Sequence, residues 1–94
     1  VENPVTGTVE TETSGKIRLT PNPAQDRFQI ERSEGFSGNA DIRILSADGR
    51  LVFQQIMSSD KMQIKTAGWE NGVYFVHLSN GKEQVVERLV LNKP

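Results

Sequence analysis

The chain has 94 residues, no cysteine, 11 Lys and Arg residues, 12 Asp and Glu residues, and a formal net charge of −1. This length allows one domain with a modest core, and the lack of cysteine excludes a disulfide framework and a thiolate zinc site. Basic residues scattered among acidic ones argue against a nucleic-acid-binding surface. No stretch approaches the roughly 20 apolar residues that span a bilayer.

Residues 1–15 are predicted to form a flexible linker, and residues 16–94 the domain. The linker is rich in Thr, Glu, Gly and Val, with isolated apolar residues and no helical period. The chain opens on Val1 rather than Met, and no secretory signal peptide is recognisable. We therefore expect a fragment of a longer protein whose export signal lies on the missing N-terminal part.

Alternating apolar and polar residues predict short strands from Lys16 onward. The first, second, third and fifth strands are marked by four apolar pairs: Ile17 and Leu19, Phe28 and Ile30, Ile42 and Ile44, and Met62 and Ile64. Residues 50–57 predict the fourth strand, but which of its faces is buried stays open. The competing apolar sets are Val52 and Ile56 on one face, and Leu51 and Phe53 on the other.

The last two predicted strands cover residues 73–78 and 84–91. Residues 73–78 are apolar on both faces except for His77, which predicts a central position in a sheet. In the final strand we favour Leu89 and Leu91 for the core-facing side. Two hairpins are predicted as type I′ turns, with Asp48-Gly49 and Asn80-Gly81 as their central residues.

Seven short strands with turns every 8–12 residues and no helix predict an all-β domain. Two antiparallel sheets packed face to face are the stable way to bury so many half-apolar strands. The predicted fold is therefore an Ig-like antiparallel β-sandwich.

Four short signals punctuate these strands in a fixed order. They are Pro21-Asn22-Pro23-Ala24, Asp48-Gly49-Arg50, Gly72-Val73-Tyr74-Phe75-Val76 and Arg88-Leu89-Val90. Each has an ordinary structural explanation as well: a rigid corner, a hairpin turn, a backbone turn before a strand, and a terminal strand. Their order, spacing and position near the end of the chain carry more information than any one of them.

Together the four signals resemble the C-terminal sorting domain of type IX secretion cargo, type A family, over residues 17–93. That family carries P-N-P before a strand, then G-R or G-K with an apolar residue two positions on, as with Val52 here. G-x-Y follows, and a basic residue before apolar ones lies near the end. Three positions depart from the pattern: Trp69 replaces the usual leucine, Thr66 an apolar residue, and Arg88 the more usual lysine.

The resemblance implies a domain that directs a covalently linked N-terminal cargo across the outer membrane. The implied partners are the type IX translocon, outer-membrane shuttle components, and a sortase-like cysteine protease that cuts in the linker and anchors the cargo at the cell surface. The implied route runs through the periplasm to the surface or the medium. The residues expected to carry recognition are Pro21, Asn22, Pro23, Gly49, Arg50, Gly72, Tyr74, Arg88, Leu89 and Val90.

The residues themselves give little support for catalysis, so no enzyme activity, cofactor or metal is expected in this chain. His77 is the single histidine, and no G-x-S-x-G elbow, phosphate-binding loop or set of zinc ligands is present. One alternative function is an Ig-like or fibronectin-like accessory module that binds carbohydrate or protein through an exposed Trp69, although we expect Trp69 to be partly buried. A second is a spacer or dimerisation domain, with a weak dimer formed through edge strands.

Overall fold

The computed structural model describes residues 16–33 and 38–94. The predicted linker, and the predicted loop residues Gly35 and Ser37, lie outside these described residues. The seven strands of the described part are β2 (Ile17–Thr20), β3 (Arg27–Arg32), β4 (Ala40–Ser46), β5 (Leu51–Met57), β6 (Lys61–Lys65), β7 (Gly72–Ser79) and β8 (Gln84–Leu91). No helix able to span a membrane is found within the described residues.

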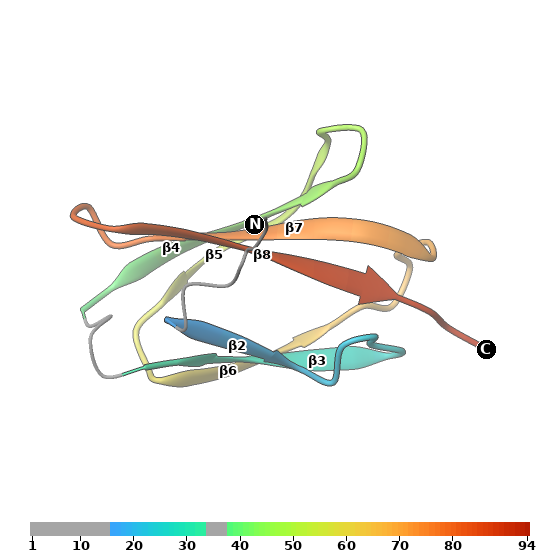
Figure 1. Ribbon diagram of the computed structural model, residues 1–94, viewed down its shortest axis with the longest axis horizontal. Coiled ribbons are helices and arrows are strands. Elements are labelled where there is room, and N and C mark those ends of the chain that lie inside the picture. Colours follow the sequence, from blue (N-terminus) through green and yellow to red (C-terminus); the bar gives the residue numbers. More distant parts are fainter. Residues whose placement is uncertain (1–15, 34–37) are drawn as a thin grey trace, which may run out of the picture.

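The strands form two antiparallel sheets that pack as two layers (Figure 1). One sheet has the order β2-β3-β6 and the other the order β5-β4-β7-β8. The predicted β-sandwich is therefore confirmed. The central position predicted for β7 is also confirmed, because β7 pairs with β4 on one side and β8 on the other.

Side-chain alternation places one face of each strand in the core. On β8 the buried residues are Val85, Leu89 and Leu91, which confirms the core face favoured from the sequence. β5 buries Met57 and packs Phe53 against the core, whereas its Ile56 is 57% exposed. From residue 53 to residue 57 the face with Phe53 is therefore the core face. The register shift opposite Ile44 and Leu45 interrupts the alternation before Phe53, so Val52 also packs against the core and Leu51 is exposed.

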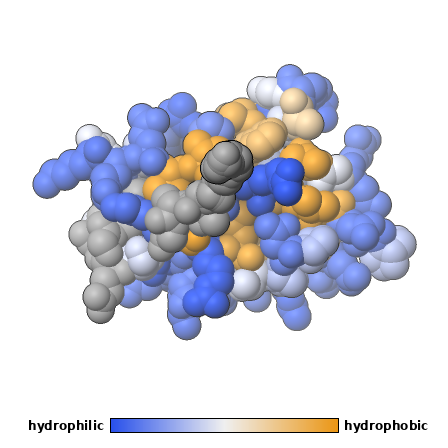
Figure 2. Space-filling view, viewed as in Figure 1, coloured by the Kyte–Doolittle hydropathy of each residue, from blue (hydrophilic) through white to orange (hydrophobic). Residues whose placement is uncertain are grey.

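Figure 2 shows the outer surface of the molecule in the view of Figure 1. Hydrophobic side chains gather in a band across the middle of the molecule, and hydrophilic side chains surround it. In the same view the two layers of Figure 1 lie above and below the band. The buried core cluster takes apolar side chains from both sheets, so burial between the sheets holds the molecule together, as expected for a chain without disulfides.

Both hairpins exist, but their central residues are not those predicted. The Gly49 N–H donates to the Ser46 carbonyl at 2.9 Å, so Ala47 and Asp48 are central and Gly49 follows them. In the other hairpin the Asn80 N–H donates to the Glu83 carbonyl at 3.2 Å, which leaves Gly81 and Lys82 between them. The Asn80 side chain accepts from the loop's backbone amides, and this bonding favours Asn80 outside the central pair.

Candidate functional site

Alternate connections of this sandwich meet at the same end of the molecule. Successive strands are antiparallel partners or run in opposite directions, so the β2–β3, β4–β5 and β6–β7 connections and the end of β8 lie together. Each of the four sequence signals lies on one of these segments. We call this end the motif end, and it comprises residues 21–24, 47–50, 69–74 and 88–93.

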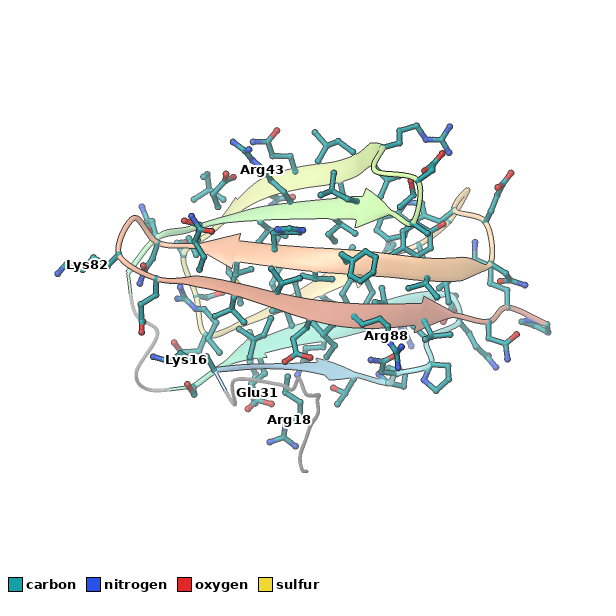
Figure 3. All side chains as sticks on the ribbon, turned by 45° about the horizontal axis from the view of Figure 1, so that its top comes forward. Lys16, Arg18, Glu31, Arg43, Lys82 and Arg88 are labelled. Carbon is teal, nitrogen blue, oxygen red and sulfur yellow. The ribbon has the colours of Figure 1, made fainter. Side chains whose placement is uncertain are left out.

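The opposite end carries the other connections and the first described residue. Lys82 lies in the β7–β8 hairpin, and Lys16, just before β2, forms an ion pair with Glu83 of that hairpin. In Figure 3 the labelled Lys16 and Lys82 lie towards the left, away from Arg88. The residues that precede Lys16 therefore join the domain at the end remote from the four signals.

Asn22 joins the first signal to the last. Its side-chain amide donates to the Arg88 carbonyl at 2.9 Å and its side-chain oxygen accepts from the Val90 N–H at 3.0 Å. A side-chain amide has one donor and one acceptor side in the same plane, so it can pair with an exposed strand edge as another backbone would. Asn22 thus occupies part of the outer edge of β8.

Ala24 extends this pairing by one step. Its N–H donates to the Val90 carbonyl and its carbonyl accepts from the Asn92 N–H, both at 2.8 Å, as an isolated parallel bridge to Leu91. The methyl group of Ala24 is fully buried. Pro21 and Pro23, each preceded by a cis peptide bond, lie on either side of Asn22 and are exposed. The Pro-Asn-Pro-Ala corner therefore covers the edge of the last strand over residues 88–92.

A second asparagine holds the chain just beyond β8. The Asn71 side chain accepts from the Lys93 N–H at 2.7 Å and donates to the Lys93 carbonyl at 3.3 Å. The Lys93 ammonium then donates to the carbonyls of Thr66 and Trp69 at 2.8 and 2.6 Å. The sequence analysis missed the role of Asn71 and Lys93. The available signal was an Asn before the glycine of the third motif and a lysine after the last apolar run.

Trp69 lies at the centre of an aromatic cluster beneath the motif end. Its ring centroid is 5.3 Å from that of Tyr74 and 6.4 Å from those of both Phe28 and Phe53. These partners come from both sheets, so Trp69 bridges the layers where the sandwich ends. The partial burial expected for Trp69 is confirmed. Its ring packs against three other aromatic rings, and the residue also lines the groove described below.

The glycine and the tyrosine of the third signal, Gly72 and Tyr74, are each required by the structure for a different reason. Gly72 has a φ of 148°, a backbone conformation that residues with a side chain rarely adopt. Tyr74 is buried, and its hydroxyl donates to the Glu70 carbonyl at 2.5 Å, which satisfies its one polar atom. Together they fix the turn that leads from Trp69 into β7.

A groove of about 550 Å³ opens between the second and third signals. Its lining includes Asp48 and Arg50 on one side and Trp69, Gly72 and Tyr74 on the other. The hydrogen bond from the Ser46 hydroxyl holds the pKa of the exposed Asp48 below its ordinary value. The groove therefore presents an ionised carboxylate and a guanidinium close to each other on a turn that Gly49, with a φ of 89°, allows.

Thr66, which stands where the family pattern has an apolar residue, is fully buried and bonded. Its hydroxyl donates to the Gln25 carbonyl at 2.7 Å, and its N–H donates to the Asp26 carbonyl at 3.0 Å. The hydroxyl therefore ties β6 to the corner that begins at Pro21. The departure from the pattern is compensated by a hydrogen bond.

Thr66→Val is expected to lower the free energy of unfolding by about 1 kcal/mol. Valine fills the same space but leaves the Gln25 carbonyl without its donor, and the loss of one such bond costs about this much. Urea titration measures the change. Thr20→Val, at an exposed position of β2, is the matched control and should stay within about 0.5 kcal/mol of the unmodified chain. Equal losses for the two variants would contradict this role of Thr66.

The three residues of the last signal, Arg88, Leu89 and Val90, differ in their exposure. The backbone carbonyl of Arg88 is held by Asn22, whereas its side chain is exposed on the outer face of the sheet. Leu89 is fully buried in the core and Val90 partly buried. Among the described residues, no group of three or more His, Cys, Asp and Glu side chains is placed to hold a metal ion.

The four signals are therefore one arrangement: two are joined by hydrogen bonds and two face each other across a groove.

A search of the solved structures finds a similar fold in the crystal structure of dimeric latent PorU from Porphyromonas gingivalis, with a TM-score of 0.55 and 18% identity. The match covers 83% of this chain and 9% of that one. No curated protein matches the chain. A family model described as the secretion system C-terminal sorting domain matches residues 18–92, so the chain belongs to this family, whose members are the sorting signals of type IX secretion.

Proposed function

We propose that the motif end is the surface by which the type IX machinery recognises this sorting domain. The observation that carries the proposal is the gathering of all four signals at one end, although they are spread over residues 21–90. Core packing alone does not account for this, because Asp48, Gly49 and Arg50 are exposed and the buried residues continue along the whole sandwich. An exposed groove beside a rigid frame is the usual form of a recognition site.

Within this surface the expected recognition residues have two kinds of role. Arg50, Pro21 and Pro23 are exposed and can touch a partner. Asn22, Gly72, Tyr74 and Leu89 act by holding the loops and the last strand in place. We assign Gly49 to the residues that hold the loops in place. Arg88 and Val90 lie on the outer face of the sheet, and we assign them to the residues that touch a partner.

The cargo precedes Lys16 and so joins the domain at the end opposite to the proposed recognition surface. A translocon component that holds the motif end would therefore contact the domain at the end opposite to Lys16. We propose that a sortase-like cysteine protease cuts within residues 1–15, and that the cargo is then anchored at the outer membrane or released. The route passes through the periplasm, and any enzymatic activity resides in the cargo rather than in this domain.

Arg50→Ala tests the proposed surface. Arg50 lies in the β4–β5 turn of the motif end, and Lys82 lies in the β7–β8 turn of the opposite end; both are exposed basic residues on the same sheet. Export of a fused fluorescent cargo in a Bacteroidota host is expected to fall severalfold with Arg50→Ala and to stay unchanged with Lys82→Ala. Thermal unfolding of both purified variants should match the unmodified domain, because neither side chain contributes to the core.

Equal export of both variants, with folding intact, would show that the charge on the motif-end groove is not recognised. Equal loss in both would point to general basic charge rather than to this end of the sandwich.

A further inference from the structure

We infer that the outer edge of β5 is a self-association site, at which a second copy of this chain adds its own β5 in antiparallel register. Strand edges expose unpaired backbone N–H and C=O groups, and stable monomeric domains usually block them. The sandwich has four such edges among its described strands, namely β2, β5, β6 and β8. Three of them are protected over at least part of their length, each in a different way.

β2 has four residues, includes Arg18, and ends at the Pro21–Pro23 corner. β6 carries exposed lysines at both ends, Lys61 and Lys65. β8 is covered over residues 88–92 by the hydrogen bonds of Asn22 and Ala24. Short length, prolines, lysines and a covering segment are the common means of preventing strand addition.

β5 has none of these protections over most of its length. Its sequence, LVFQQIM, contains no charge, no proline and no glycine in seven residues. Ile56 is 57% exposed and Leu51 is 48% exposed, the largest exposed apolar side chains on the strand. A register shift opposite Ile44 and Leu45 disturbs the strand near its start, so the regular part is residues 53–57. In Figure 3, β5 is the uppermost strand of the four-stranded sheet.

The free backbone groups of this regular part belong to Gln54 and Ile56. The Ser46 N–H donates to the Arg50 carbonyl across the β4–β5 pair, and residues of an antiparallel strand bond alternately to the two sides. Ile42 therefore faces β5 as Ser46 does, and its register partner Gln55 points its N–H and C=O at β4. The residues on either side of Gln55 point theirs outward.

A two-fold axis beside Gln55 lets two such edges pair with each other. Gln54 of each copy then exchanges backbone hydrogen bonds with Ile56 of the other, and Phe53 lies opposite Met57. Gln55 lies opposite its own copy, in a pair without hydrogen bonds. No charged side chain of β5 enters this contact, so its uncharged surface meets an equally uncharged one. The two four-stranded sheets become one continuous sheet, with an isologous interface.

The test measures association of the isolated chain by sedimentation velocity up to about 1 mM, near the weak limit of specific binding. The unmodified chain is expected to show a concentration-dependent dimer. Gln55→Lys should remove it by placing two like charges opposite each other on the axis. Gln63→Lys makes the same change at an exposed position in the middle of β6, and dimer formation should persist.

A cysteine scan tests the register, because the chain has no cysteine of its own. Opposed residues of a non-hydrogen-bonded antiparallel pair have Cα atoms about 4.5 Å apart, within the range for a disulfide. Gln55→Cys should give a disulfide-linked dimer on mild oxidation, whereas Gln63→Cys should stay monomeric under the same conditions. Amide exchange should slow at Gln54 and Ile56 as concentration rises.

A chain that stays monomeric up to about 1 mM would overturn the inference, even if β5 then accepts a strand from another protein. A dimer that Gln55→Lys and Gln63→Lys weaken equally, or one that protects other amides, would overturn the assignment to β5. Because the assay uses the purified domain alone, a negative result leaves the proposed role of the motif end untouched.

Discussion

Leu89→Ala is expected to lower the free energy of unfolding by about 3 kcal/mol, within the range of about 2 to 5 kcal/mol for leucine truncation in a core. Leu89 is fully buried, lies opposite Tyr74 in the β7–β8 register, and belongs to the core cluster. The lost methyl groups leave a cavity next to the motif end. A small domain has a free energy of unfolding of about 5 to 10 kcal/mol, so this loss removes a large share of its stability.

Val86→Ala is the matched control on the same strand. Val86 is 51% exposed on the outer face, so its truncation should change stability by no more than about 0.5 kcal/mol. Urea unfolding followed by tryptophan fluorescence measures both variants, since Trp69 packs against Tyr74 beside Leu89. Similar losses in the two variants would show that the last strand does not present this face to the core.

Asn22→Ala is expected to cost about 1 to 2 kcal/mol while the domain stays folded. The alanine removes both hydrogen bonds to the edge of β8, but Ala24 still pairs with Val90 and Asn92. The exposed position of Asn22 lets water replace part of the loss. The amide of Val90, which donates to the Asn22 oxygen, should therefore exchange with solvent much faster than in the unmodified domain.

Asn39→Ala provides the comparison. Asn39 is exposed and has no side-chain hydrogen bond to another described residue, so its replacement should leave stability and the Val90 amide unchanged. In the export assay, Asn22→Ala should reduce secretion and Asn39→Ala should not, because only Asn22 holds the last strand against the corner. Unchanged exchange at Val90 in Asn22→Ala would contradict the pairing of this side chain with β8.

The sequence alone was sufficient for the fold because the local signals agree with one another. Alternation predicted all seven strands, and the apolar run of residues 73–78 predicted the central place of β7. The meeting of the four signals at one end could also have been predicted from the strand order along the chain. Every second connection of an antiparallel sandwich lies at the same end, and the signals lie on the β2–β3, β4–β5 and β6–β7 connections and at the end of β8. The turn geometry was missed because a three-residue loop with Gly49 last and a two-residue loop share the same Asp-Gly pair.

The contacts within the motif end could not be predicted in this way. Asn22 and its β8 partners are separated by 66 and 68 residues, and no local pattern encodes which strand edge a side-chain amide will meet. The Lys93 ammonium is likewise placed by the turn at Thr66 and Trp69, far away along the chain. The exposed edge of β5 could not be predicted either, because only the order of strands in the sheet shows that this uncharged strand lies at an edge.

The most direct test of the sorting role is export of a fluorescent protein that enters the periplasm and carries Val1–Pro94 at its C-terminus. The fusion is expressed in a Bacteroidota host with the type IX translocon intact or deleted. We predict fluorescence at the surface or in the medium, with the domain removed, in the intact strain alone. Fluorescence that stays in the periplasm of both strains, with the fusion intact and folded, would contradict the account.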